Sequence, residues 1–128
     1  MGDRPTKIEL LEAVRRFLDA DLIPELDGVK RFHARVAANV LGIVARELER
    51  EPDALPAMYR ELAKLLGSSE PAPAALSDLD GAIDALEEAL VGRIRAGDAD
   101  SGTFRSDTLS ALRFCVGERL AVSNPKYG

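Results

Sequence analysis

Apolar residues recur three or four positions apart in five stretches of the chain, and this spacing predicts five helices. Thr6 followed by Glu9 is the capping-box pattern of a helix start, so the first helix is expected to begin there. Its apolar face comprises Leu10, Leu11, Val14, Phe17 and Leu18. Pro24 is expected to stop or bend the chain, and the Asp-Gly pair at 27–28 predicts a turn.

The second predicted helix, from about Val29 to Glu49, has two faces of different kinds. One face is a stripe of large apolar residues, Val29, Phe32, Val36, Val40, Ile43, Val44 and Leu48. The other carries small residues, Ala34, Ala38, Gly42 and Ala45. Small residues let a neighbouring helix approach closely. A helix that is apolar on one side and small on the other is expected to lie between its neighbours, so we predict that helix two is the centre of the fold.

The third predicted helix follows a short connection that is bracketed by Pro52 and Pro56. Gly67 is expected to cap its end. Residues 68–76 are too rich in proline for a helix, so we predict a loop there. This loop is the segment that we expect to be most mobile.

The last two predicted helices complete the chain. The fourth is expected to begin at Ser77 and Asp80, with a core face of Leu79, Ile83, Leu86, Leu90 and Ile94. The fifth is expected to be capped by Ser106 or Asp107 and to carry the stripe Leu109, Leu112, Val116 and Leu120. Asn124 precedes a proline, which predicts the end of this helix.

No stretch of the chain alternates between apolar and polar residues as a strand does. The predicted fold is therefore all-α, an up-and-down bundle of about five helices with helix two central. The length of 128 residues suits one helical domain covering residues 1–128.

Composition narrows the classes of partner. The 17 basic and 22 acidic residues give a net charge of -5, which argues against general nucleic-acid binding. No apolar run approaches the roughly 20 residues that span a bilayer, so no membrane association is expected. Cys115 is the single cysteine, which excludes an internal disulfide and a cysteine metal cluster. A reducing, cytoplasmic location suits that usage.

His33, the single histidine, lies close to the apolar stripe of helix two and has two interpretations. It is either a general base or ligand-binding residue, or a buried histidine bonded to a carboxylate or carbonyl of another helix. No catalytic partner can be placed beside it from the sequence, which favours the structural interpretation.

Arg35 and Asn39 lie one helical turn apart, and Arg46 continues the same polar strip. A guanidinium offers a bidentate fork, so this strip is suited to hold a carboxylate or a phosphate. The alternative is an interhelical salt bridge together with an amide that satisfies a loop carbonyl.

Other sequence patterns associated with metal binding or catalysis are incomplete or missing. The run 98–102 resembles a calcium loop, but its glycine is misplaced and Leu109 stands where such a loop needs a glutamate. The sequence has no metal-ligand pair, no glycine-rich phosphate loop and no nucleophile elbow, so no metal or cofactor is expected. An acidic run, Asp80, Asp84, Glu87 and Glu88, is expected to be a solvated face, with a docking surface for a basic partner as the alternative.

Five segments together resemble a family of small bacterial proteins with no assigned function. They are 3–6, 10–14, 32–39, 94–97 and 120–127. The most specific are the Phe-His-Ala-Arg-Val-Ala-Ala-Asn block at 32–39 and the terminal Asn-Pro-Lys-Tyr. The genes of that family often lie beside those for acyl-CoA dehydrogenases and for kinases similar to aminoglycoside phosphotransferases. The resemblance therefore implies an accessory role in acyl-CoA or lipid catabolism, and it supplies no catalytic residue.

The resemblance also implies that the tail folds across helix two, so that His33, Arg35, Asn39 and Tyr127 form one network. With Arg46, these are the candidate residues for binding a ligand or a partner. The leading hypothesis is a non-enzymatic accessory protein for an acyl-CoA dehydrogenase or a phosphotransferase-like kinase. The alternative is a protein or small enzyme that binds acyl-CoA or a phosphorylated metabolite through the His33 cluster.

A homodimer formed through helices is also expected. Helix two has two packing faces, and Phe114 with Ala121 lies off the stripe of the fifth helix. This is more apolar surface than one small bundle needs, and such surface usually marks an interface.

Overall fold

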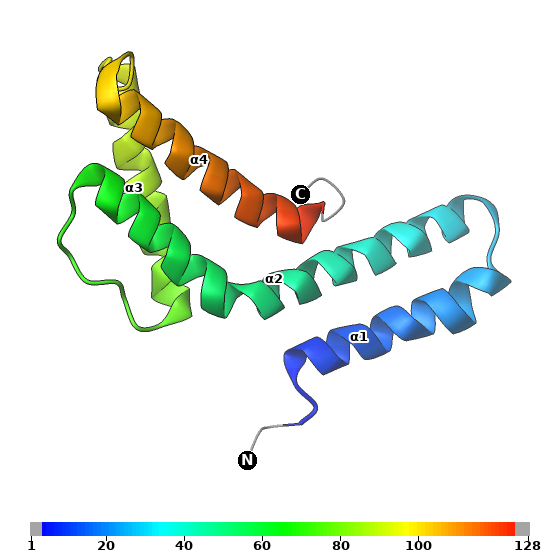
Figure 1. Ribbon diagram of the computed structural model, residues 1–128. Helices are drawn as coiled ribbons and strands as arrows, with labels where there is room; N and C mark the ends of the chain where they lie inside the picture. The colour runs from blue at the N-terminus through cyan, green and yellow to red at the C-terminus, as the bar shows by residue number, and fades with distance from the viewer. Residues whose placement is uncertain (1–3, 125–128) are drawn as a thin grey trace. The chain divides into compact units, whose positions relative to one another are not determined.

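Four α-helices make up most of the part of the chain that the computed structural model describes, residues 4–124. They are α1 (Lys7–Phe17), α2 (Gly28–Leu66), α3 (Leu76–Arg95) and α4 (Gly102–Ser123), as Figure 1 shows. A π-helical turn, Leu18–Leu22, and a 3-10 turn, Ile23–Glu25, lead from α1 towards α2. The described range has no β-strand, so the all-α class is confirmed, with four helices in place of the five predicted. None of these helices is long and apolar enough to cross a membrane.

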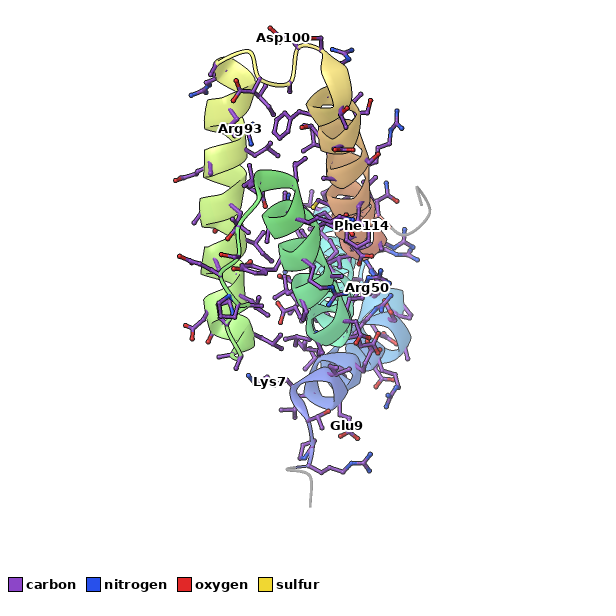
Figure 2. All side chains as sticks on the ribbon, turned by 60° about the vertical axis from the view of Figure 1, so that its left-hand side comes forward. Lys7, Glu9, Arg50, Arg93, Asp100 and Phe114 are labelled. Atoms are coloured by element: carbon purple, nitrogen blue, oxygen red, sulfur yellow. The ribbon has the colours of Figure 1, made fainter. Side chains whose placement is uncertain are left out.

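The start of α1 has the predicted capping box, and Figure 2 labels its Glu9. The amide of Glu9 donates to the Thr6 hydroxyl at 3.1 Å, and the amide of Thr6 donates to the Glu9 carboxylate at 3.0 Å. Two backbone groups that a helix start leaves unpaired are thereby satisfied. The helix boundary is therefore determined by local side chains.

Pro52 and Pro56 do not end a helix, and this corrects the predicted connection between helices two and three. A proline removes one helical hydrogen bond and costs roughly 3 kcal/mol inside a helix. Residues beyond the prolines, such as Met58 and Leu62, are buried in a core, and their burial offsets that cost. The chain nevertheless divides into two compact units between Glu49 and Arg50, three positions or fewer from the first proline.

Unit 1, Met1–Glu49, contains α1 and the first part of α2, which lie side by side in Figure 1. The small face of α2 is buried here, as predicted for a close helix approach, since Ala38 and Ala45 are 4% and 3% exposed. The Arg15 guanidinium of α1 lies 3.1 Å from the position that a β-carbon on Gly42 would occupy. A glycine at this position therefore leaves room for the arginine of the neighbouring helix.

Unit 2, Arg50–Gly128, holds the hydrophobic core. Its buried cluster comprises Met58, Tyr59, Leu62, Ala63, Leu79, Ile83, Leu90 and Cys115, from α2, α3 and α4. Arg50 of α2 also forms an ion pair of 2.9 Å with Glu118 of α4, and Figure 2 labels Arg50. The predicted core residues of the fourth helix, Leu79, Ile83 and Leu90, are confirmed as buried.

The connections of unit 2 follow the predicted loop and the predicted glycine end of α2. Gly67 ends α2 with a φ of +70°, a conformation that favours glycine, and α3 begins at Leu76 without a side-chain cap. The Tyr59 hydroxyl donates to the Glu70 carbonyl at 3.1 Å, which holds the loop against α2. The helix predicted to begin at Ser77 therefore begins one residue earlier, at Leu76.

The loop between α3 and α4 is shorter than predicted, because α4 begins at Gly102 rather than at Ser106 or Asp107. Phe104, in the first turn of α4, packs against the core and lies under the Arg93 guanidinium at 4.0 Å. That packing makes an earlier helix start favourable. Asn124 is the C-cap of α4, as the proline after it predicts.

Candidate functional site

The residues singled out from the sequence lie on the surface of α2 in unit 1. His33, Arg35 and Asn39 are exposed, and Arg46 is partly buried. The His33 ring contacts the exposed Phe32 ring edge-on, with 5.7 Å between ring centroids. His33 is therefore exposed, and the interpretation of it as a buried histidine bonded to another helix is wrong. Tyr127, the fifth candidate, lies outside the described residues, so the proposed network with the tail stays a prediction.

Five of the seven residues of the predicted large apolar stripe of α2 are exposed, and Ile43 and Leu48 are partly buried, which corrects the expectation that the stripe is a core face. Its exposed fractions are Val29 71%, Phe32 63%, Val36 43%, Val40 51% and Val44 37%. We call these five residues the α2 stripe. Residues on opposite sides of a helix cannot pack against the same neighbour, and α1 takes the small face instead. The sequence revealed both faces but not which of them is covered within the chain.

Basic residues occupy the same stretch of α2 as the stripe, and Lys30 and Arg35 lie on its flanks. Residues 28–46 include Lys30, Arg31, Arg35 and Arg46 and no aspartate or glutamate, although the whole chain has a net charge of -5. Lys30, Arg31 and Arg35 form no ion pair within residues 4–124. The stripe is thus an apolar surface with unpaired positive charges beside it.

A second exposed apolar surface lies in unit 2, where α3 and α4 leave an open cleft of about 100 Å³. We call it the α3–α4 cleft. Its apolar lining is Leu62, Leu90, Val91, Ile94, Leu112, Cys115 and Val116. Val91 and Val116 are 44% and 50% exposed. The stripe predicted for the fifth helix is therefore partly a surface of this cleft.

An ion pair that sequence reasoning missed closes one side of the α3–α4 cleft. Arg119 of α4 donates to both carboxylate oxygens of Glu87 of α3, one of them at 3.3 Å. The hydrogen bond with Glu87 raises the pKa of Arg119 further above its ordinary value. The two residues are 32 positions apart, so no local pattern could have indicated the pair.

Cys115 lies at the floor of the α3–α4 cleft and is 4% exposed. Burial raises the pKa of its thiol, and the nearby Arg119 charge opposes that rise. A buried thiol with a raised pKa is a poor nucleophile at neutral pH. Cys115 therefore serves as a small apolar core residue, as its isolation in the sequence indicates.

The acidic run of α3 borders a shallow depression next to the cleft. The depression measures about 580 Å³ and is lined by Asp84, Glu87, Glu88, Val91, Gly92 and Arg95. Asp84 and Glu88 form no ion pair within the described part of the chain. Glu87 and Val91 line the cleft as well, so these carboxylates form an acidic edge of that apolar surface.

The 98–102 run is a turn, as expected after the calcium-loop pattern failed. Arg93 forms an ion pair of 3.0 Å with Asp98, and Figure 2 shows Arg93 and Asp100 at this end of unit 2. No group of three or more potential metal-ligating side chains occurs among residues 4–124.

Phe114 of α4, labelled in Figure 2, is partly buried and packs against the buried cluster of unit 2. The sequence placed it off the apolar stripe and suggested a contact outside the bundle. The stripe itself is the more exposed surface, so the two roles are reversed relative to the prediction.

The comparisons with known proteins concern the family alone. No curated protein and no solved structure shows a significant match to the chain. A family model described as a domain of unknown function (DUF6285) matches residues 24–127, which include the α2 stripe and the α3–α4 cleft. α1 lies outside the matched range. Since the match covers most of the chain, this protein belongs to the DUF6285 family, for which no function is assigned.

Proposed function

We propose that this chain is a non-enzymatic accessory protein that acts by binding other proteins through its helices. The observation that carries the proposal is the exposure of unit 1, where eight large apolar side chains are 37–71% exposed. They are Leu10, Val14, Phe17 and the five residues of the α2 stripe. Exposed rows of large apolar side chains, such as these two on α1 and α2, usually mark interaction sites.

The polar candidate residues fit the same proposal. His33, Arg35 and Asn39 project from the surface of one helix, beside exposed apolar residues. Arginine and aromatic residues next to apolar side chains are typical of protein–protein interfaces. A small-molecule site needs a concave pocket onto which a few polar groups converge, and a helix surface does not supply one.

Small-molecule binding in the α3–α4 cleft has less support. Its volume of about 100 Å³ is below the roughly 300–1,000 Å³ typical of ligand pockets. A thermal-shift screen with CoA esters and phosphorylated metabolites tests this alternative. A rise in melting temperature that Arg35→Ala abolishes would favour ligand binding at the His33 cluster, and a rise that Arg35→Ala leaves unchanged would favour binding in the α3–α4 cleft.

The chain resembles bacterial proteins that are encoded beside acyl-CoA dehydrogenases and phosphotransferase-like kinases. This resemblance supports one of these enzymes as the partner, and the contact would then form in the cytoplasm. We assign the enzyme contact to the apolar row of α1. Leu10, Val14 and Phe17 share one face of α1 and are 50–52% exposed. They form a short ridge that fits the groove of a partner helix.

Co-purification from the native host tests this function. The tagged chain is expected to recover an acyl-CoA dehydrogenase or a phosphotransferase-like kinase, and Leu10→Ser with Phe17→Ser is expected to abolish the recovery. Arg16→Ser, another exposed position of α1, is the matched control and should leave it intact. Recovery of neither enzyme with the unmodified chain would contradict the proposed function. Equal recovery with the Leu10/Phe17 variant would place the contact elsewhere.

A further inference from the structure

We infer that the α2 stripe binds the α3–α4 cleft of a second copy of this chain, and that both copies do so reciprocally. The inference goes beyond the accessory function, because it concerns two surfaces that the enzyme contact on α1 does not use. It assigns to the dimer an interface different from the one expected around Phe114.

The two surfaces match in apolar character. The α2 stripe is a convex row of valines and one phenylalanine, and it extends over 16 residues, or about 22 Å of helix. The α3–α4 cleft is concave and lined by aliphatic side chains, of which Val91, Leu112 and Val116 are 44%, 38% and 50% exposed. A helix that lies along such a cleft removes apolar area from water on both partners.

The two surfaces are opposite in charge. Lys30 and Arg35 are exposed on the two flanks of the stripe and carry no ion-pair partner among the described residues. Asp84 and Glu88 are exposed beside the cleft and are likewise without an ion pair in that range. Opposite charges at the edges of an apolar contact steer association and select the register.

A second copy suits both surfaces better than stripe-to-stripe pairing does. Two α2 stripes placed face to face would bring two sets of basic residues together, and like charges disfavour such a contact. Each chain carries both complementary surfaces, so a closed two-fold pair of copies contains the contact twice. Closed two-fold pairs of this kind are the commonest homo-oligomers.

Sedimentation equilibrium of the purified full-length chain tests the inference. The unmodified chain is expected to have the mass of two copies. A stripe variant, Lys30→Glu with Arg35→Glu, and a cleft variant, Asp84→Lys with Glu88→Lys, place like charges on both contacts. Each variant alone is expected to dissociate about 100-fold more readily, because like charges at an interface cost several kcal/mol.

A mixture of the two variants provides the decisive measurement. In the mixed pair the acidic stripe of one variant meets the basic cleft of the other, and the remaining contact is unmodified. The mixture is therefore expected to recover the mass of two copies, although each variant alone is monomeric. Arg16→Glu with Arg60→Glu changes the net charge of the chain as the stripe variant does, at exposed positions away from both surfaces, and should leave the dimer intact.

Several results would overturn the inference. One is an unmodified chain that stays monomeric at high micromolar concentration. Another is a dimer that both variants leave unchanged, and a third is a mixture that does not reassociate. If the stripe variant loses the host enzyme in co-purification while the purified chain is monomeric, the stripe serves that enzyme rather than a second copy. Because sedimentation uses the purified chain alone, its failure is distinct from a failure of the enzyme contact.

Discussion

The two units of this chain use their apolar residues in opposite ways. Unit 2 buries leucine and isoleucine side chains from three helices in one cluster. Among the described residues of unit 1, the buried hydrophobic side chains are Ile23, Ala38 and Ala45, while valines and phenylalanines stay exposed. A small unit that buries so little apolar area gains little stability from the hydrophobic effect. Unit 2 therefore contains most of the apolar burial that stabilises the chain, and unit 1 leaves more of its large apolar side chains exposed.

Truncating one apolar side chain in each unit tests this difference most strongly. Leu62 is 1% exposed, so Leu62→Ala is expected to lower the free energy of unfolding by about 2–5 kcal/mol. Val36→Ala in the α2 stripe is expected to change it by about 0.5 kcal/mol or less. Urea denaturation of the dilute chain measures both values. Equal costs would show that the stripe is a core face after all.

Phe114 distinguishes the core from the surface within α4. Phe114→Glu is expected to lower the free energy of unfolding by about 1–3 kcal/mol, because the ring packs against the buried cluster. Leu109→Glu, at a position that is 42% exposed, serves as the control and should have a small effect. A folded, stable Phe114→Glu chain with weakened association would restore the interface predicted from the sequence.

Removing the capping box tests whether the stability of α1 depends on local interactions. Thr6→Ala removes the hydroxyl that accepts from Glu9, which is expected to cost about 1 kcal/mol of local stability. Hydrogen exchange should show faster exchange of the α1 amides and unchanged exchange in the core of α3. Faster exchange in both helices would mean that the two units unfold together.

The smallest expected effect is that of Cys115→Ala on the pH dependence of the free energy of unfolding. Burial raises the pKa of its thiol, so the folded chain holds this proton more tightly than the unfolded chain does. The resulting stability is present below the ordinary thiol pKa of about 8.5 and is lost as pH rises through the folded-state pKa. Unfolding free energies of the unmodified chain should fall more steeply above that pH than those of Cys115→Ala. Parallel curves would contradict a buried, protonated thiol.

Local features of the fold follow from the sequence because neighbouring residues create them. The capping box at Thr6 and Glu9, the glycine end of α2 at Gly67 and the end of α4 at Asn124 each depend on residues within one turn. Helical periodicity likewise identified both faces of the first half of α2. These signals predict where a helix lies and which residues share a face.

Other features depend on segments that meet only in the folded chain. The helix that continues through Pro52 and the early start of α4 reflect packing in unit 2, which outweighs local preference. The Arg119–Glu87 pair joins residues far apart in sequence. Periodicity likewise cannot show whether a face finds a neighbour, so the sequence predicted a buried α2 stripe. The tertiary structure decided otherwise, because α1 covers the small face and leaves the stripe exposed to solvent.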